Sequence, residues 1–256
     1  MIVTDEAKAM DLACMAGQIL LENGAELSRV EETMNRIADH YGVETRQFYL
    51  LTNGIFSTSG GRYAKVNPIP VKGSQFDKVE AVSQLSRDIV AGKYSIEEAV
   101  EKLEEIKNMK RLPKWKVILA AGFGSAAFSL LFGGNFHDAL VALFAGWALY
   151  IFVAFVGNAH LSKIFCNSVG SFIAAFVCFL GFHFEIGHHL SQMIIGAVMP
   201  LIPGVPFVNG IRDLTNGDYL SGLIRMMDAI LIFICIAFGV SLALIIGNDC
   251  IGGVVL

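Results

Sequence analysis

Six polar side chains follow a proline-rich apolar stretch near the end of the sequence, and their types fit the handling of a small charged solute. They are Asn209, Arg212, Asp213, Asp218, Arg225 and Asp228. A guanidinium group attracts a carboxylate, and a carboxyl group can exchange a proton. We therefore expect Arg212 and Arg225 to attract a carboxylate-bearing solute and Asp213 or Asp228 to bind a proton. Asp228 could instead simply cap the helix that follows it.

The stretch before these residues is unusual for a helix that crosses a membrane. It reads MPLIPGVPF and contains Pro200, Pro203, Gly204 and Pro206. Each proline removes a backbone donor and clashes with the carbonyl four residues back, so a regular helix cannot continue through all three. One proline would indicate an ordinary kink, whereas three predict a broken or re-entrant segment of the kind that forms solute sites in transporters. Pro203, Gly204 and Pro206 are therefore further candidates for the solute site.

Both features lie in the part of the chain with the fewest charges. Residues 117–256 contain 3 of the 19 Lys/Arg and 6 of the 23 Asp/Glu residues. Five apolar stretches there contain no charged residue, and each approaches the roughly 20 residues that a helix needs to cross a bilayer. We predict an α-helical integral membrane protein whose residues 113–256 form five transmembrane helices, at about 117–134, 139–157, 164–182, 190–208 and 229–247.

The cations predict the orientation of these helices, because Lys and Arg accumulate on the cytoplasmic side of a membrane. Five of them precede the first span: Lys107, Lys110, Arg111, Lys114 and Lys116. Five crossings place the loops with Lys163, Arg212 and Arg225 on that same side. We therefore expect a multi-pass protein in the lipids of a bacterial inner membrane, with the N-terminus in the cytoplasm and the C-terminus outside.

Residues 1–112 have the composition of a separate cytoplasmic α+β domain. Apolar residues at helical spacing predict helices at 5–22, 26–41, 76–91 and 96–109, the last beginning with the capping box of Ser95 and Glu98. Strand-like segments lie at 43–52, 54–59 and 62–69, and glycine-containing turns separate them. The alternating acids and bases of this part exclude a basic surface for nucleic acid.

The densest charge cluster of this domain is GAELSRVEETM, which contains Glu26, Arg29 and Glu32. One interpretation is a ladder of surface salt bridges on one helix face. The other is docking of the domain on the cytoplasmic mouth of the membrane half, where Arg212 and Asp213 would face the cluster. Both remain open at this point.

Asn167 is the best polar candidate inside the third apolar stretch, because an amide in hydrocarbon needs a partner. Together with Ser168 and Ser171 it could line a polar path, although small residues at this spacing also serve simple helix packing. The histidine-rich segment HFEIGHH matches no zinc motif, so we predict no metal site. Nucleotide and hydrolase signature motifs are missing from the sequence, so we expect no cofactor and no enzyme.

Two long motifs, NGAELSRVEETMNRIADHYG and IPGVPFVNGIRDLTNGDYLSGLIR, closely resemble the threonine/serine exporter family. The resemblance covers nearly the whole chain and is to the larger half of that family. It implies a cytoplasmic domain joined to about five transmembrane helices in a secondary-active exporter of small polar metabolites. Members export threonine and serine, and two-component bacterial members pair this half with a smaller membrane protein and are linked to succinate efflux. The resemblance thus implies a smaller membrane subunit as partner.

Two other functions compete with export of threonine, serine or a C4 dicarboxylate such as succinate. A membrane-anchored hydrolase would need a nucleophile and a base in the cytoplasmic domain, where Ser57 and His40 are among the few candidates. A regulatory subunit of another transporter would leave transport to its partner alone.

Overall fold

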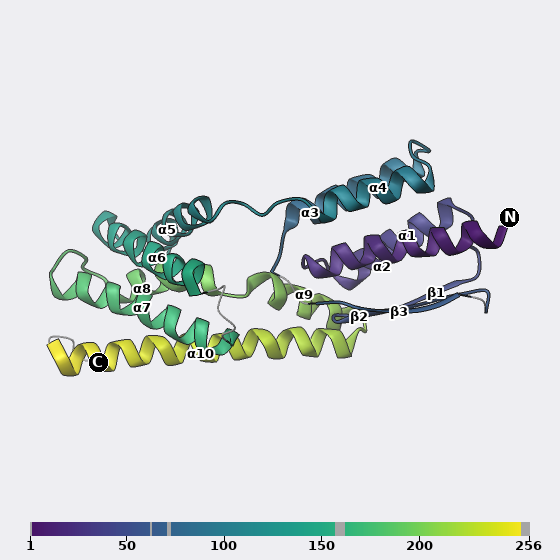
Figure 1. Cartoon of the computed structure of the whole chain (residues 1–256). Coiled ribbons are helices and arrows are strands. Elements are labelled where there is room, and N and C mark those ends of the chain that lie inside the picture. The colour runs from purple at the N-terminus through teal and green to yellow at the C-terminus, as the bar shows by residue number, and fades with distance from the viewer. Residues whose placement is uncertain (1, 62, 71–72, 157–161, 252–256) are drawn as a thin grey trace. The chain divides into compact units, whose positions relative to one another are not determined.

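The structure is a computed structural model that describes residues 2–61, 63–70, 73–156 and 162–251 (Figure 1). These residues are mostly helical and form two compact units. Unit 1 contains residues 1–111 together with 205–226, and unit 2 contains residues 112–204 together with 227–256. A short segment from the second half of the sequence therefore folds with the N-terminal part.

Unit 1 combines four helices with a small antiparallel sheet. Its elements are α1 (Ile2–Glu22), α2 (Leu27–His40), β1 (Arg46–Leu51), β2 (Gly54–Ser59), β3 (Tyr63–Pro68), α3 (Phe76–Val90) and α4 (Ile96–Lys107). The segment 205–226 adds most of α9 (Gly204–Thr215) and the start of α10 (Tyr219–Ile251). These bounds agree with the predicted helices and strands to within a few residues.

The apolar spacing read from the sequence explains how these elements pack. On α2, Leu27, Val30, Met34 and Ile37 are buried and form one face of the helix. The sheet has the order β1-β2-β3, and Ile55 of β2 joins the same core. Ser95 and Glu98 form the predicted capping box at the start of α4.

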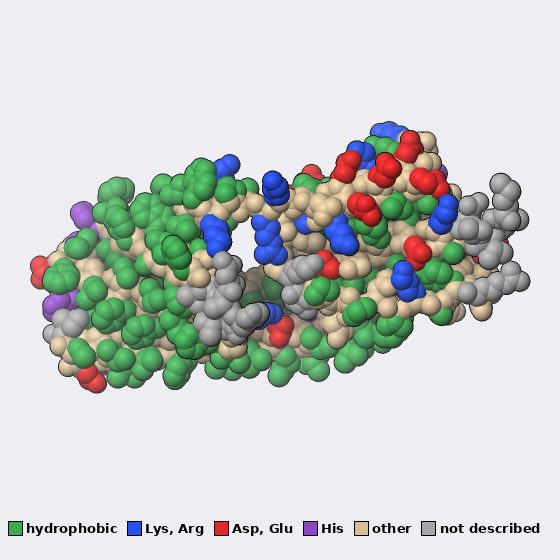
Figure 2. Space-filling model, viewed as in Figure 1, with side chains coloured by type: hydrophobic (Ala, Val, Ile, Leu, Met, Phe, Trp, Pro, Cys, Tyr) green, Lys and Arg blue, Asp and Glu red, His purple; other side chains and the backbone are tan. Residues whose placement is uncertain are grey.

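Unit 2 is a bundle of apolar helices. It contains α5 (Lys114–Leu131), α6 (Phe136–Val156), α7 (Lys163–His183), α8 (Leu190–Val198), the 3₁₀ turn η1 (Met199–Leu201) and most of α10. Large apolar side chains point outward from it, among them Phe123, Phe144 and Phe155. Figure 2 shows hydrophobic side chains over α5, α6 and α7, whereas charged side chains gather over α3 and α4. Such a surface is typical of a protein that spans a membrane.

Four of the described helices are long and apolar enough to cross a bilayer, or up to five if a broken helix pair counts as one span. Three of them, α5, α6 and α7, match predicted stretches, although residue 157 at the end of the second stretch lies outside the described residues. The fourth stretch is the broken pair. The fifth predicted stretch, 229–247, lies within α10, which begins ten residues earlier at Tyr219. Asp228 consequently lies inside α10 and does not cap it.

Small residues let the helices of unit 2 approach closely. Ser125, Ser129 and Ser171 are fully buried, and the Ser171 hydroxyl donates a hydrogen bond to the Ser168 carbonyl of its own helix. Gly239 of α10 packs against Ser168 and Ser171 so tightly that an added Cβ would overlap the Ser168 carbonyl oxygen. The serines of α7 therefore serve helix packing.

This close approach predicts a strong dependence on side-chain size. Gly239→Ala should lower the free energy of unfolding by about 1–3 kcal/mol, because helix α10 must shift away from α7. Gly124→Ala is the matched control, since nothing lies within 4 Å of the added Cβ and alanine is the better helix former. Thermal unfolding of the purified chain in detergent, followed by the fluorescence of Trp115 and Trp147, measures both. Equal midpoints for the two variants would contradict the close contact.

Candidate functional site

The helix break lies where the three prolines predicted it. Helix α8 passes into η1, Ile202 adopts an extended conformation, and α9 starts at Gly204. Pro203 is buried, and Pro206 lies in the first turn of α9, where a helix needs no amide donor. Two backbone groups at the break have protein partners: the Tyr150 hydroxyl of α6 donates to the Pro200 carbonyl at 3.2 Å, and the Gly204 amide donates to the Ile202 carbonyl at 2.8 Å.

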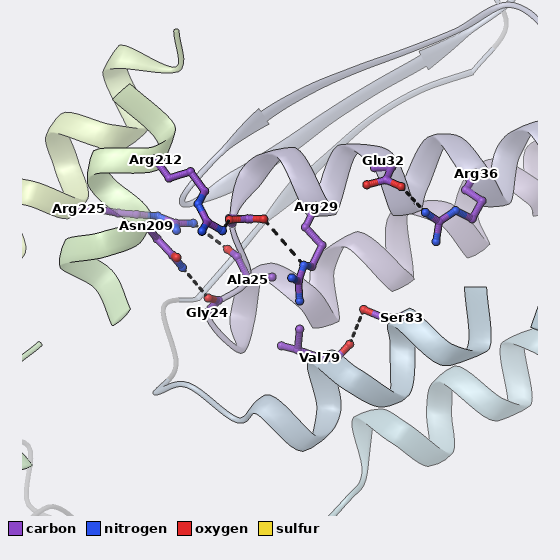
Figure 3. A network of polar contacts seen from close by, with 11 residues as sticks. Gly24, Ala25, Arg29, Glu32, Arg36, Val79, Ser83, Asn209, Arg212 and Arg225 are labelled. Carbon is purple, nitrogen blue, oxygen red and sulfur yellow. Dashed lines mark hydrogen bonds and ion pairs between the residues drawn. The ribbon is translucent and has the colours of Figure 1, made fainter. Parts of the chain in front are cut away.

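Three of the residues that we predicted to handle a solute contact the loop between α1 and α2 in unit 1 (Figure 3). The Asn209 amide donates to the Gly24 carbonyl at 2.9 Å, and Arg225 donates to the Ala25 carbonyl at 3.0 Å. Arg212 forms an ion pair with Glu26. The side chains that a solute would need are thus engaged with main-chain and carboxylate groups of unit 1.

Asp213 is the most deeply buried of these residues. Its side chain is 0% exposed, and its carboxylate lies 3.3 Å from Nε of Arg225, which is itself 13% exposed. The carboxylate also faces the backbone N–H of Leu27 at the start of α2, where a helix end favours negative charge. Neither oxygen of this buried carboxylate completes a hydrogen bond within the described structure, so its compensation comes from the charge of Arg225. The backbone carbonyl of Asp218, which precedes α10, accepts a hydrogen bond from the Gly222 amide.

The charge cluster on α2 forms only part of the predicted ladder of surface salt bridges. Arg29 lies 3.9 Å from Glu26, which is at the limit for an ion pair, and Glu32 pairs with Arg36. Of the three residues predicted to dock on other parts of the chain, only Glu26 contacts the segment 205–226 in the described structure. Arg29 reaches that segment only through Glu26.

A mostly apolar groove in unit 2 brings together two other predicted residues. It has a volume of about 300 Å³ and lies between the start of α7 and α10. Its lining residues are Ser162, Lys163, Ile164, Asn167, Asp228, Leu231, Ile232 and Cys235. Asn167 donates to the Lys163 carbonyl at 2.9 Å, which leaves its amide oxygen as an acceptor.

Lys163 and Asp228 give this groove one charge of each sign. Both side chains are exposed, and within the described ranges neither has an ion-pair partner within 4 Å. Few other charges occur in the apolar helices around them. The lining of the groove therefore includes a cation, a carboxylate and an amide, which makes it the candidate functional site.

Asp138 is a structural carboxylate that the sequence analysis did not single out. It is fully buried at the start of α6 and accepts hydrogen bonds from the backbone amides of Asn135, His188 and His189. Its second oxygen lies 2.7 Å from Nδ1 of His189, the residue that precedes α8. Asn135 with Asp138 three residues later is a capping pattern that could have predicted this role.

Asp138→Ala should lower the free energy of unfolding by about 2–4 kcal/mol, because several charge-assisted hydrogen bonds and a helix cap are lost together. Asp249→Ala removes an exposed carboxylate near the end of α10 and is the control. Denaturation in detergent followed by tryptophan fluorescence gives both values. If Asp138→Ala unfolds at the same denaturant concentration as the control, the hydrogen bonds at Asp138 contribute little.

A hydrolase would need an activated nucleophile, and the contacts of Ser57 do not activate its hydroxyl. The Ser57 hydroxyl accepts a hydrogen bond from the Cys14 thiol at 3.2 Å and lies 3.4 Å from the Lys65 carbonyl. Burial raises the pKa of Cys14, which keeps the thiol protonated. Neither neighbour of Ser57 can serve as its general base.

Comparison with known proteins places the chain in one family. Residues 11–247 match the family model described as "Putative threonine/serine exporter". A "Threonine/serine exporter" of Corynebacterium glutamicum is 26% identical over 93% of this chain, which spans 51% of that relative. The "Probable succinate transporter subunit YjjP" of Escherichia coli is 23% identical, over 95% of this chain and 96% of the relative. No solved structure matches the chain.

Proposed function

Since the chain belongs to the threonine/serine exporter family, we propose that it is one subunit of a secondary-active exporter of small polar metabolites. Its substrate is threonine, serine or a C4 dicarboxylate such as succinate. It acts with a smaller membrane subunit, which the name of the Escherichia coli relative, a probable transporter subunit of similar length, supports. The observation that carries this proposal is the groove that Lys163, Asn167 and Asp228 line in an otherwise apolar bundle.

The groove residues have separate roles in this proposal. Lys163 attracts the carboxylate that all of these substrates share. Asn167 accepts a hydrogen bond from a hydroxyl or ammonium group of the solute. Asp228 binds the exchanged proton or the ammonium group, and its place inside α10 puts this charge beside the membrane-spanning part of the helix.

The orientation follows from the cations. Lys114 and Lys116 lie at the start of α5, and Lys163 lies at the start of α7, so both ends belong on the cytoplasmic side of a bacterial inner membrane. The groove then opens toward the cytoplasm, where an exporter collects its substrate. The Asn209, Arg212, Asp213 and Arg225 contacts fix the segment that leads from the helix break into α10.

Substrate counterflow in vesicles that contain the chain and the smaller membrane subunit tests this function. Labelled serine, threonine and succinate are offered separately, and at least one is expected to exchange only when both subunits are present. If the smaller subunit alone gives the full rate, the chain is a regulator of a transporter. If none of the three exchanges while the purified full chain hydrolyses a panel of esters, the hydrolase interpretation replaces the exporter.

A further inference from the structure

A small pocket in unit 1 lies where the ends of α1 and α4 meet the start of α3. Its volume is about 200 Å³, and its lining residues are Ile19, Glu22, Asn23, Gln75, Lys78, Lys107, Met109 and Arg111. Liquid water occupies about 30 Å³ per molecule, so the pocket has room for a solute of about five to eight non-hydrogen atoms. Three of the lining residues are cations and one is an acid, so the lining carries an excess of two positive charges.

Lys78 is the buried cation of this pocket. The residue is only 9% exposed, and its ammonium group donates a hydrogen bond to the Lys107 carbonyl at 2.7 Å. Among the described residues no carboxylate forms an ion pair with it, so its partner is a neutral carbonyl. An ammonium group has three N–H donors, and a buried charge is costly unless another charge compensates it. A negatively charged ligand in the pocket would provide that compensation.

The other polar groups of the pocket offer more donors than acceptors. The Glu22 carboxylate accepts a hydrogen bond from the Gln18 amide at 2.9 Å, and the Gln75 amide oxygen accepts one from Nε of Arg111 at 3.3 Å. Four of the five guanidinium N–H groups of Arg111 take no part in this bond, and Lys107 adds a further ammonium group. A ligand that consists mainly of acceptors, such as a carboxylate or a phosphate, matches this lining.

The start of α3 adds a weaker preference for an anion. Gln75 precedes this helix, and its side chain does not cap the first turn. The first backbone N–H groups of a helix have no partner within the helix and favour negative charge. Asp77 already places one acid in this turn, and the carboxyl ends of α1 and α4 have the opposite polarity. The buried ammonium group of Lys78 is therefore the main reason to expect an anion here.

We propose that this pocket binds a small dianion, such as inorganic phosphate or a C4 dicarboxylate, and that unit 1 is therefore a ligand-binding unit. The two negative charges of the ligand balance the excess charge of the lining. Lys78 donates to the anion inside the pocket, and Lys107 and Arg111 bind it at the exposed rim. All lining residues belong to unit 1, whereas the groove with Lys163 and Asp228 belongs to unit 2. The inference thus goes beyond the proposed function and does not depend on it.

Equilibrium dialysis of the purified full-length chain in detergent tests the pocket, with labelled inorganic phosphate and labelled succinate offered separately. Low ionic strength is used, because salt screens the exposed charges at the rim. At least one of the two anions is expected to bind saturably. Lys78→Met should weaken that binding roughly 10- to 100-fold, because a buried hydrogen bond to a charged group is lost. Methionine preserves the apolar stem, and replacement of a buried charge by an apolar group is often neutral for stability.

Two exposed lysines of one short stretch provide a matched pair of variants. Lys107→Gln and Lys110→Gln each remove one positive charge, but only Lys107 lines the pocket. Lys107→Gln is expected to weaken binding of the anion several-fold, and Lys110→Gln less than twofold. This comparison still tests the proposal if Lys78→Met fails to fold.

Three results would overturn the proposal. The first is that neither anion binds saturably. The second is equal affinity of the Lys107→Gln and Lys110→Gln variants, which would indicate diffuse attraction to the basic segment. The third separates the pocket from the groove of the proposed function: succinate binding that is lost in Asp228→Asn and kept in Lys78→Met, without binding of phosphate, would assign the anion to the groove. Binding that survives in Asp228→Asn and is lost in Lys78→Met supports the pocket, whatever the chain transports.

Discussion

Asp228→Asn is expected to slow substrate counterflow roughly 10- to 100-fold at equal protein level. An interaction with a charged group contributes about 1.5–3 kcal/mol, and 1.4 kcal/mol corresponds to a factor of ten. The variant keeps the shape of the groove and removes only the charge that Asp228 presents beside Lys163 and Asn167. The initial rate of exchange in vesicles with both subunits is the measurement.

Two controls separate this effect from general damage. Asp249→Asn removes an exposed carboxylate from the far end of the same helix and should keep the wild-type rate. Arg212→Ala breaks an exposed pair with Glu26 in unit 1 and should change the rate less than twofold. If Asp228→Asn transports as fast as Asp249→Asn, the groove is not the solute site. A large loss of counterflow rate in Arg212→Ala would indicate that the solute binds to the polar residues after the prolines.

Arg225→Met is expected to lower the free energy of unfolding of unit 1 by about 3–5 kcal/mol. Removal of one partner leaves the Asp213 carboxylate buried without its counter-charge, which is far more costly than the loss of an exposed pair. The Ala25 carbonyl also loses its donor. Arg212→Met provides the contrast, since its side chain is 53% exposed and its pair with Glu26 is expected to contribute less than about 1 kcal/mol.

Cys14 provides a local measurement of this stability. It is buried in unit 1, and its raised pKa keeps the thiol unreactive until the unit opens. Alkylation of Cys14 at increasing urea concentration, with the other four cysteines replaced, therefore reports unfolding of unit 1 in the full chain. The double variant Arg225→Met with Asp213→Asn should regain part of the loss. Identical urea midpoints for Arg225→Met and Arg212→Met would rule out the buried pair as a major contributor.

The sequence predicted those features that depend on local chemistry. The capping box at Ser95 and Glu98, the apolar face of α2 and the helix break at the prolines each follow from a few neighbouring residues. The apolar stretches of α5, α6 and α7 follow in the same way from their length and lack of charge. In each case the physical cause lies within one or two turns of the chain.

The candidate site could be predicted only in part, because its partners are distant in the sequence. The six polar residues after the prolines looked like one set, but Asn209 and Arg225 bond the loop at residues 24 and 25, whereas Asp228 lines the groove with α7. The start of α10 was missed for the same reason. The charges of Arg225 and Asp228 are typical of a loop rather than of an apolar helix. In the structure, however, Arg225 forms an ion pair with Asp213 and its side chain is largely buried in unit 1.

The division of unit 1 in the sequence affects how the chain must be made. Its second segment begins at Val205, 94 positions after Arg111, and the intervening residues form α5 to α8 of the apolar bundle. Asn209 and Arg225 donate hydrogen bonds to the carbonyls of Gly24 and Ala25. At a synthesis rate of 5–20 residues per second, the two donors are synthesised on the order of ten seconds after these carbonyls. The amino-terminal domain thus reaches its final form only after bilayer insertion is well under way, so that biogenesis of the two units is coupled in time.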